Sequence, residues 1–211
     1  TTNFANERGG AIFLNDANAT FTACTFSGNT NGSTGSGGAL DVNNSTLNLS
    51  SCAFLNNVSH FEGGAINSQN STLVFSNSSF TSNQNSSFNG GGALNIKGGT
   101  LSDVNGTFTG NTSGALGGAI NGASAVLTFA DSNFTSNVSQ FEGGAINGTS
   151  VSLVLTNCSF TSNQNASFNG GGALNVKGGT LSDINGTYTG NSCAPESGGG
   201  AIQWAGTDAN F

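Results

Sequence analysis

Apolar and small residues recur along this chain in a fixed pattern with a period of 26–28 residues. The tetrapeptide Gly-Gly-Ala-Ile/Leu occurs eight times, with its first glycine at Gly9, Gly37, Gly63, Gly91, Gly117, Gly143, Gly171 and Gly199. In all seven complete repeats an aromatic residue follows 17 positions after that glycine, and an asparagine follows three positions later. Repeats differ in length only between that asparagine and the next glycine pair. The chain is therefore an array of short, equivalent units.

Within each repeat the apolar positions alternate with polar ones, which is typical of β-strands. Counted from the first glycine as zero, Ile or Leu occupies position +3 in every repeat, and Leu occupies position +10 in six of them. Apolar residues at position +12 are Phe21, Leu49, Phe75, Phe129, Leu155 and Phe211. The spacing predicts three short strands per repeat, joined by bends, and one repeat for each turn of a β-solenoid.

We expect an all-β fold, a right-handed single-stranded parallel β-helix with about eight coils of 26–28 residues. The handedness follows from the strong preference of parallel strand connections for right-handed crossovers. A helical fold is disfavoured because every repeat contains several Gly, Asn, Ser and Thr residues. We expect residues 1–211 to form one continuous solenoid segment that belongs to a longer or a polymerising protein.

The asparagine of each Phe-x-x-Asn motif is predicted to point inward. Equivalent residues of successive coils lie about 4.8 Å apart, so these amides can hydrogen-bond from coil to coil as they do in stacked asparagine ladders. The predicted ladder consists of Asn29, Asn57, Asn83, Asn111, Asn137, Asn163 and Asn191. The motif therefore predicts a polar column inside an otherwise apolar core.

Composition excludes several classes of function. Charged residues make up 6% of the chain, and only three are Lys or Arg. Binding to a nucleic-acid backbone needs several cations, so no nucleic-acid partner is expected. The sequence has no apolar run of the length that crosses a bilayer, so we expect no direct membrane insertion. The 16 phenylalanines argue against a disordered chain.

The alternating Gly-Gly-Ala-Ile/Leu and Phe-x-x-Asn motifs resemble the repeat region of chlamydial polymorphic outer membrane proteins and related β-helical surface proteins. The resemblance covers essentially the whole chain, and eight copies of one motif alternating with seven of the other make it specific. It implies an exported, surface-displayed rod without enzymatic activity that takes part in adhesion and self-association. We therefore expect a secreted or cell-surface protein whose partners are glycans and further copies of the same repeat.

Our leading hypothesis is a non-enzymatic extracellular structural rod, an N-glycosylated component of a fibre or surface filament. The alternative is the passenger of an autotransporter-type surface adhesin, and a more remote one is a polysaccharide-active β-helix enzyme. End-to-end stacking would suit open strand edges, which template further pairing. In such a fibre Phe211 would continue the +12 column into the next molecule.

Asn-x-Ser/Thr sequons occur about twice as often as the composition predicts by chance. One explanation is that β-solenoids favour Asn, Ser and Thr at turns; the other is N-glycosylation in a secretory pathway. We expect glycans on position +14 because it should face outward, and on the loop position +22; Asn133 is a further candidate. The glycosylation candidates are Asn77, Asn105, Asn157 and Asn185 at +14, Asn31, Asn85 and Asn165 at +22, and Asn133. We expect no cofactor other than such covalent glycans.

Cys24 and Cys52 share position +15 on adjacent coils, about 4.8 Å apart, which lies within the Cα distances of disulfides. A disulfide between them is one interpretation, and a stacked pair of buried thiols is the other. Cys158 and Cys193 occupy different columns and are not expected to bond. The sequence has no Cys or Cys/His spacing typical of a metal site.

No catalytic residue is predicted. Asp103 and Asp183 share one column but lie three coils apart, about 14 Å, which exceeds the separation of roughly 5–9.5 Å between glycosidase carboxylates. Residues 58–111 closely resemble residues 138–191, and in this internal copy His60 is replaced by Gln140. The lysines of the two copies, Lys97 and Lys177, have no matching acid nearby in the sequence.

Overall fold

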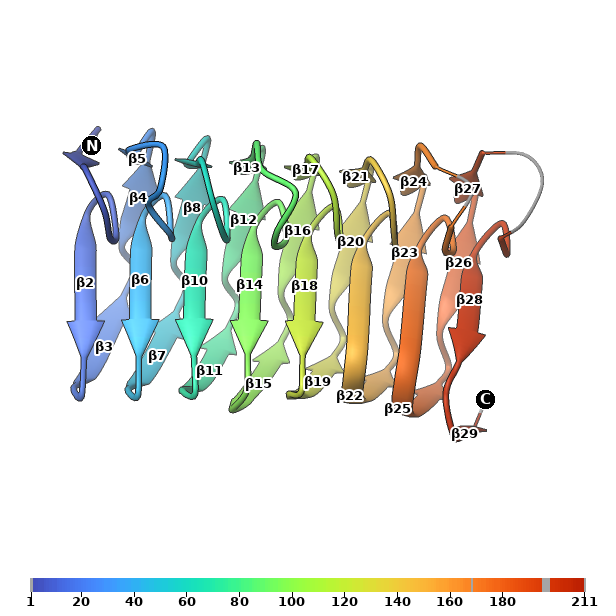
Figure 1. Ribbon diagram of the computed structural model, residues 1–211. Coiled ribbons are helices and arrows are strands. Elements are labelled where there is room, and N and C mark those ends of the chain that lie inside the picture. Colours follow the sequence, from blue (N-terminus) through green and yellow to red (C-terminus); the bar gives the residue numbers. More distant parts are fainter. Residues whose placement is uncertain (1, 168, 195–197, 211) are drawn as a thin grey trace.

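The computed structural model describes residues 2–167, 169–194 and 198–210. These residues form a right-handed parallel β-solenoid, and no helix occurs among them. In Figure 1 the front strands run downward and the rear strands upward while the chain advances from left to right, which is a right-handed winding. The solenoid has about seven turns instead of the eight expected, because the eight glycine pairs bound only seven complete repeats.

Each turn contains four strands, not the three predicted, and the strands of successive turns pair in parallel. The first strands are β2 (Ile12–Asn15), β6 (Leu40–Asn43), β10 (Ile66–Gln69), β14 (Leu94–Lys97), β18 (Ile120–Ala123) and β28 (Ile202–Ala205). The second strands are β3 (Asn18–Thr22), β7 (Thr46–Ser50), β11 (Thr72–Ser76), β15 (Thr100–Val104), β19 (Val126–Ala130) and β29 (Asp208–Asn210). In two turns the first and second strands are continuous, as β22 (Ile146–Thr156) and β25 (Leu174–Ile184).

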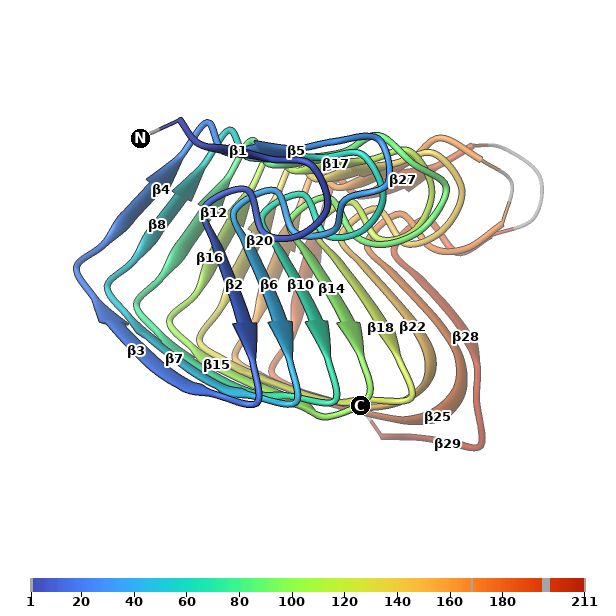
Figure 2. The same cartoon turned by 60° about the vertical axis from the view of Figure 1, so that its left-hand side comes forward.

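The other two strands of each turn form two separate sheets. The third strands are β4 (Thr25–Ser27), β8 (Ala53–Leu55), β12 (Ser79–Thr81), β16 (Thr107–Thr109), β20 (Asn133–Thr135), β23 (Ser159–Thr161) and β26 (Thr187–Thr189). The fourth strands are β1 (Phe4–Ala5), β5 (Thr30–Asn31), β9 (Val58–Ser59), β13 (Gln84–Asn85), β17 (Thr112–Ser113), β21 (Val138–Ser139), β24 (Gln164–Asn165) and β27 (Ser192–Cys193). Figure 2 shows these sheets as walls of stacked turns, with the loops gathered beyond the fourth strand. The fourth strand escaped prediction because it is only two residues long and has no apolar residue in four of its eight copies, β5, β13, β17 and β24.

Three corners of every complete turn contain a residue with positive φ, at positions +7, +14 and +19, and in two turns Gly99 or Gly179, which follows the first of these, also has positive φ. In one turn they are Gly98 (φ 66°), Asn105 (φ 56°) and Gly110 (φ 62°). Gly, Asn and Asp tolerate the left-handed region better than other residues. Their recurrence at these corners therefore has a structural cause, independent of any modification.

The glycine pair is required by close packing of successive turns. The first glycine adopts positive φ in five of the eight pairs, as at Gly63 (φ 62°), and the second lies against the backbone of the next turn, as at Gly64. A Cβ on Gly64 would lie 1.9 Å from the carbonyl oxygen of Gly92. Any side chain there would force the turns apart.

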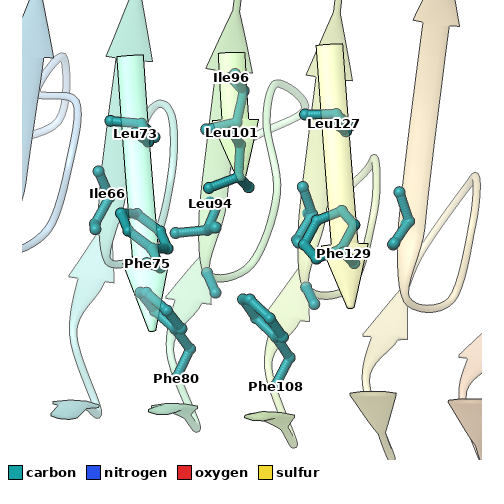
Figure 3. Packing of buried hydrophobic residues seen from close by; sticks show 14 of the residues in the cluster. Ile66, Leu73, Phe75, Phe80, Leu94, Ile96, Leu101, Phe108, Leu127 and Phe129 are labelled. Carbon is teal, nitrogen blue, oxygen red and sulfur yellow. The ribbon is translucent and has the colours of Figure 1, made fainter. Parts of the chain in front are cut away.

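The core consists of the predicted columns of equivalent side chains, which Figure 3 shows for the central turns. Seven aromatic rings at position +17 stack with centroids 4.7–5.0 Å apart, from Phe26 to Tyr188. Leu and Phe side chains at +10 and +12, such as Leu73 and Phe75, are buried beside them. Phe211, the last residue predicted for the +12 column, lies outside the described residues.

The predicted asparagine ladder runs beside the aromatic stack. Each Nδ2 donates to the Oδ1 of the next turn at 2.8–3.0 Å, for example from Asn83 to Asn111. The Nδ2 of Asn83 also donates to the Phe54 carbonyl, and its backbone N–H donates to the same Asn111 oxygen. All four hydrogen-bonding roles of a buried amide are thus used, which removes the desolvation cost of placing it in the core.

Two carboxylates occupy the +12 column where other turns have Phe or Leu. Asp103 is buried and accepts a hydrogen bond from the Ser132 hydroxyl at 2.8 Å, and Asp183 accepts one from the Tyr188 hydroxyl at 2.6 Å. Position +15 of the same turns is Gly106 or Gly186, where a Cβ would collide with the carboxylate. Burial raises the pKa of Asp103 to about 6, although Ser132 and the Gly106 N–H partly lower it.

We predict that Asn111→Ala lowers the free energy of unfolding by about 3 kcal/mol, because it leaves the buried N–H of Asn83 without an acceptor and creates a cavity. Urea denaturation followed by circular dichroism measures the change. The control is Asn133→Ala, which removes an exposed asparagine from the neighbouring turn and should change stability by less than about 1 kcal/mol. Equal effects of the two substitutions would contradict a structural role for the ladder.

A second prediction concerns pH. The native Asp103 carboxyl binds its proton more tightly than the unfolded chain does, so the protein should lose stability as pH rises from about 4 to about 6. The upward shift from 3.8 to about 6 corresponds to about 3 kcal/mol. Asp103→Asn should remove this loss, and the exposed control Asp131→Asn should retain it, when urea midpoints are compared between pH 4 and pH 8. An unchanged pH profile in Asp103→Asn would show that this carboxyl is not the source.

Candidate functional site

A cleft of about 350 Å³ opens on the surface of the first four turns. It lies where the segment before each glycine pair meets the first strands of the solenoid. Its walls are Glu7, Arg8, Thr34, Ser36, Asp41, Phe61, Glu62, Gln69 and Lys97. The cleft thus gathers two of the three cations of the chain, together with three carboxylates.

Three repeat positions supply six of the nine wall residues, and Glu7, Thr34 and Phe61 come from the segment just before them. The residue before the first glycine stacks from turn to turn, and parallel bridges join Arg8 to Ser36 and Ser36 to Glu62. Position +4 contributes Asp41, and position +6 contributes Gln69 and Lys97. Since each position recurs every turn, side chains far apart in the sequence become neighbours along the axis.

Two ion pairs cross the cleft. Arg8 Nη1 lies 3.7 Å from Asp41 Oδ2, and Lys97 Nζ is paired with Glu62 Oε1. The side chains of Asp41 and Glu62 are 2% and 3% exposed, whereas those of Arg8 and Lys97 are half exposed. Burial raises the pKa of Asp41, and hydrogen bonding from Asn67 and the charge of Arg8 partly oppose it. The carboxylates are therefore fixed, and the cations extend toward solvent.

A second amide ladder, at position +4, holds Asp41 in place. The Nδ2 of each member donates to the Oδ1 of the preceding turn at 2.7–2.9 Å, through Asn67, Asn95, Asn121, Asn147 and Asn175. These bonds run opposite to those of the first ladder. The ladder ends at Asp41, whose carboxylate accepts the final hydrogen bond, because the preceding position is Phe13. This ladder was not predicted from the sequence, although asparagine recurs at +4 in five repeats.

Lys97 and Lys177, which have no matching acid nearby in the sequence, do have acid partners in the fold. Lys97 is paired with Glu62, and in the internal copy Lys177 is paired with Glu142. Each acid lies 35 residues earlier in the sequence, on the preceding turn, so a search for acids close to each lysine in the sequence does not find it. The two pairs could have been predicted from the sequence, because Glu62 and Lys97 recur with the same spacing as Glu142 and Lys177.

The glycosylation candidates at position +14 lie outside, as predicted. Asn77, Asn105, Asn157 and Asn185 are exposed corner residues, and Asn133 is exposed on β20. Their side chains pair along the surface: the Nδ2 of Asn105 donates to Asn77 Oδ1 at 3.2 Å, and that of Asn185 donates to Asn157 Oδ1 at 3.0 Å. Five of the eight candidates are therefore accessible to solvent.

The loop position +22 is not exposed, so its prediction as an acceptor site is corrected. Asn31, Asn85 and Asn165 are almost completely buried at the inner side of the fourth strand. The Nδ2 groups of Asn85 and Asn165 donate to the carbonyls of Asn89 and Asn169 and so fold the longer loops. Asn31 instead donates to the Ser59 hydroxyl at 3.2 Å. The 28-residue repeats have Asn or Cys at this position, and the 26-residue repeats have Ser.

All four cysteines lie within the described part of the chain, and all are free thiols. The disulfide between Cys24 and Cys52, one of the two interpretations, is not formed. Cys24 Sγ lies 3.4 Å from the Thr22 carbonyl, and Cys52 Sγ lies 3.3 Å from the Phe21 carbonyl. Equivalent side chains of parallel strands keep a separation near 4.8 Å, longer than the usual Cβ distance of about 3.8 Å in disulfides. The other interpretation, a stacked pair of buried thiols, holds in part: both thiols are free, and Cys52 is buried whereas Cys24 is only partly buried.

Among the described residues, no group of three or more His, Cys, Asp or Glu side chains is arranged to bind a metal ion. His60 Nδ1 lies 2.8 Å from the Asn31 carbonyl, so this ring holds a loop. Asp103 and Asp183 belong to the core. Within the same ranges, no helix is long and apolar enough to cross a membrane. The cleft, which gathers five charged side chains, is therefore the candidate site within the described part of the chain.

Comparison with known proteins adds no function to this geometry. No family model, no curated protein and no solved structure matches the chain. The fold and the cleft are therefore the basis on which a function is inferred.

Proposed function

We propose that this chain is a non-enzymatic extracellular structural rod, an N-glycosylated component of a fibre or surface filament. The observation that carries the proposal is the continuity of the interior along one axis. The ring stack and both amide ladders pass from turn to turn, so each turn is stabilised mainly by its neighbours. Such a molecule resists bending and separates whatever is attached to its two ends.

The outer surface supports extracellular glycosylation. The asparagines at +14 begin intact sequons, protrude from corners and make only exposed side-chain hydrogen bonds, so a sugar would not disturb the core. Their left-handed geometry explains why asparagine is favoured there, so the support comes from exposure and not from sequon number. Glycans on adjacent turns would crowd each other at about 4.8 Å, and we expect partial occupancy.

Hydrophilic glycans would also help to keep the rod soluble. Only 6% of the residues are charged, and Phe61, Phe88 and Phe141 expose their rings. Exposed aromatic residues favour association between molecules. A sheath of sugars along the opposite corners would leave selected surfaces available for contact.

The alternative is a surface adhesin passenger, and the charged cleft favours it. The cleft lies beside the exposed Phe61 ring, on the side of the rod where the loops project. An adhesin needs a recognition surface of this kind, whereas a purely structural rod does not. Both proposals share the rod and differ in whether it carries a ligand.

Site-resolved mass spectrometry of the protein from its native source tests the proposal. We expect sugar on at least one of Asn77, Asn105, Asn157 and Asn185, and none on the buried asparagines. The internal controls are Asn57, Asn111 and Asn137 of the ladder and Asn85 and Asn165 of the loops, all of which also begin sequons. Absence of sugar from every site would contradict the glycosylated rod and favour the adhesin. Sugar on the ladder asparagines would contradict the fold-based assignment.

A further inference from the structure

We propose that the cleft lined by Phe61 binds a short neutral oligosaccharide. The inference goes beyond the structural role, because a rod of stacked turns needs no such site. It rests on the combination of an exposed ring, buried carboxylates and extended donors within one cavity, which the separate repeats do not require for folding.

The chemistry of the walls matches sugar hydroxyl groups, which both donate and accept hydrogen bonds. The exposed Glu7 supplies acceptors, Arg8 and Lys97 supply donors, and Gln69 supplies both, while the buried Asp41 and Glu62 hold the two cations in place. The ring of Phe61, which is 41% exposed, forms an apolar wall. Binding sites commonly combine such an apolar surface with a few fixed polar groups. A pyranose presents the complementary surface, with C–H groups on its faces and hydroxyls around its edge.

The charges of the cleft favour a neutral ligand. Arg8 and Lys97 are already paired with Asp41 and Glu62. The carboxylate of Glu7 is the third acid of the lining, so the cleft has one more acidic than basic side chain. An anionic ligand would have to approach two buried carboxylates, which are unfavourable neighbours for it. A cation would find no cluster of three ligating side chains within the described residues.

The dimensions favour a chain of sugars. The wall residues come from four successive turns, so the cleft extends over three turn-to-turn steps, about 14 Å. Its volume of about 350 Å³ lies at the lower end for small-molecule sites, about 300–1,000 Å³. A disaccharide or trisaccharide lying along the axis would contact both ion pairs.

The cleft is also rigid. The Asp41 carboxylate accepts from Asn67 Nδ2 at 2.9 Å, and Glu62 Oε2 accepts from Asn95 Nδ2 at 3.4 Å. Both carboxylates thus rest on the second ladder, whose members are fixed by the stacking of turns. A binding group held in advance loses little conformational entropy when the ligand arrives.

Comparison with the internal copy distinguishes the residues that the fold shares from those that belong to the cleft alone. It keeps the ion pair as Glu142 and Lys177 and the ring as Phe141. Around this pair, the repeat positions equivalent to Arg8, Ser36, Asp41 and Gln69 three turns on are occupied by Gly90, Leu116, Asn121 and Thr149, and of these only Gln69 and Thr149 lie within the two copies. The ring of Phe88 also lies 6.2 Å from that of Phe141. The ion pair and the ring are therefore common to both copies, whereas these polar walls surround only Glu62 and Lys97.

The test uses the 211-residue chain produced without N-glycans, so that its own sugars cannot occupy the cleft. The probes are neutral di- to tetrasaccharides of glucose, galactose, mannose and N-acetylglucosamine, with sulfated and uronic-acid oligosaccharides for comparison. Saturation-transfer NMR detects binding, and calorimetry measures the affinity. We expect at least one neutral probe to bind, and Phe61→Ala and Arg8→Ala each to weaken it by about tenfold or more.

The matched controls are Phe141→Ala and Lys177→Ala, which should leave the affinity unchanged. Circular dichroism and thermal unfolding of each variant establish that the solenoid is intact. Absence of binding to every neutral probe, or equal losses in both copies, would overturn the proposal, as would preference for the anionic probes. Cleavage of a bound neutral probe would support its place in the cleft and contradict the non-enzymatic function proposed above.

Discussion

The spacing between successive turns is the constraint on which the rest of this structure depends. Parallel strands fix it near 4.8 Å, and every inward side chain must form a contact that repeats at this distance. Phenylalanine rings satisfy it by stacking, and asparagine amides satisfy it by donating to the next amide. The glycine pair satisfies it by the absence of a side chain, since a Cβ at Gly64 would meet the next backbone. One distance therefore selects aromatic, amide and glycine residues at different positions of the same repeat.

The repeat made the columns, the parallel pairing and the first ladder predictable. The positions of Phe80 in the aromatic column and of Asn83 in the ladder could be predicted because the Phe-x-x-Asn motif, with Tyr in one copy, recurs at every complete turn. Features without a recurrent apolar residue were missed: the fourth strand has two residues, both polar in β13, and Asn85 was therefore assigned to an outer loop although it is buried. The contact of Lys97 with Glu62 joins different positions of neighbouring turns, so a search within single columns could not find it.

The cleft depends on the same regularity that builds the core. Asp41 is a departure from the +4 asparagines, and its carboxylate ends a ladder that would otherwise present an amide nitrogen to Phe13. Asp103 is a comparable departure in the +12 column, accommodated by Gly106. The first carboxylate faces a cleft and the second faces the core. A single departure from a column therefore changes the local chemistry, because the regular turns hold all the neighbouring side chains in place.

Hydrogen exchange of the asparagine side-chain amides, followed by NMR on the ¹⁵N-labelled protein, tests the central claim most directly. If axial amide bonding holds the turns together, the Nδ2 protons of Asn57, Asn83 and Asn111 should exchange as slowly as the backbone amides of the adjacent strands. Those of the exposed Asn77 and Asn105 should exchange rapidly in the same sample. Rapid exchange of the ladder protons under conditions in which the strand amides stay protected would contradict the account.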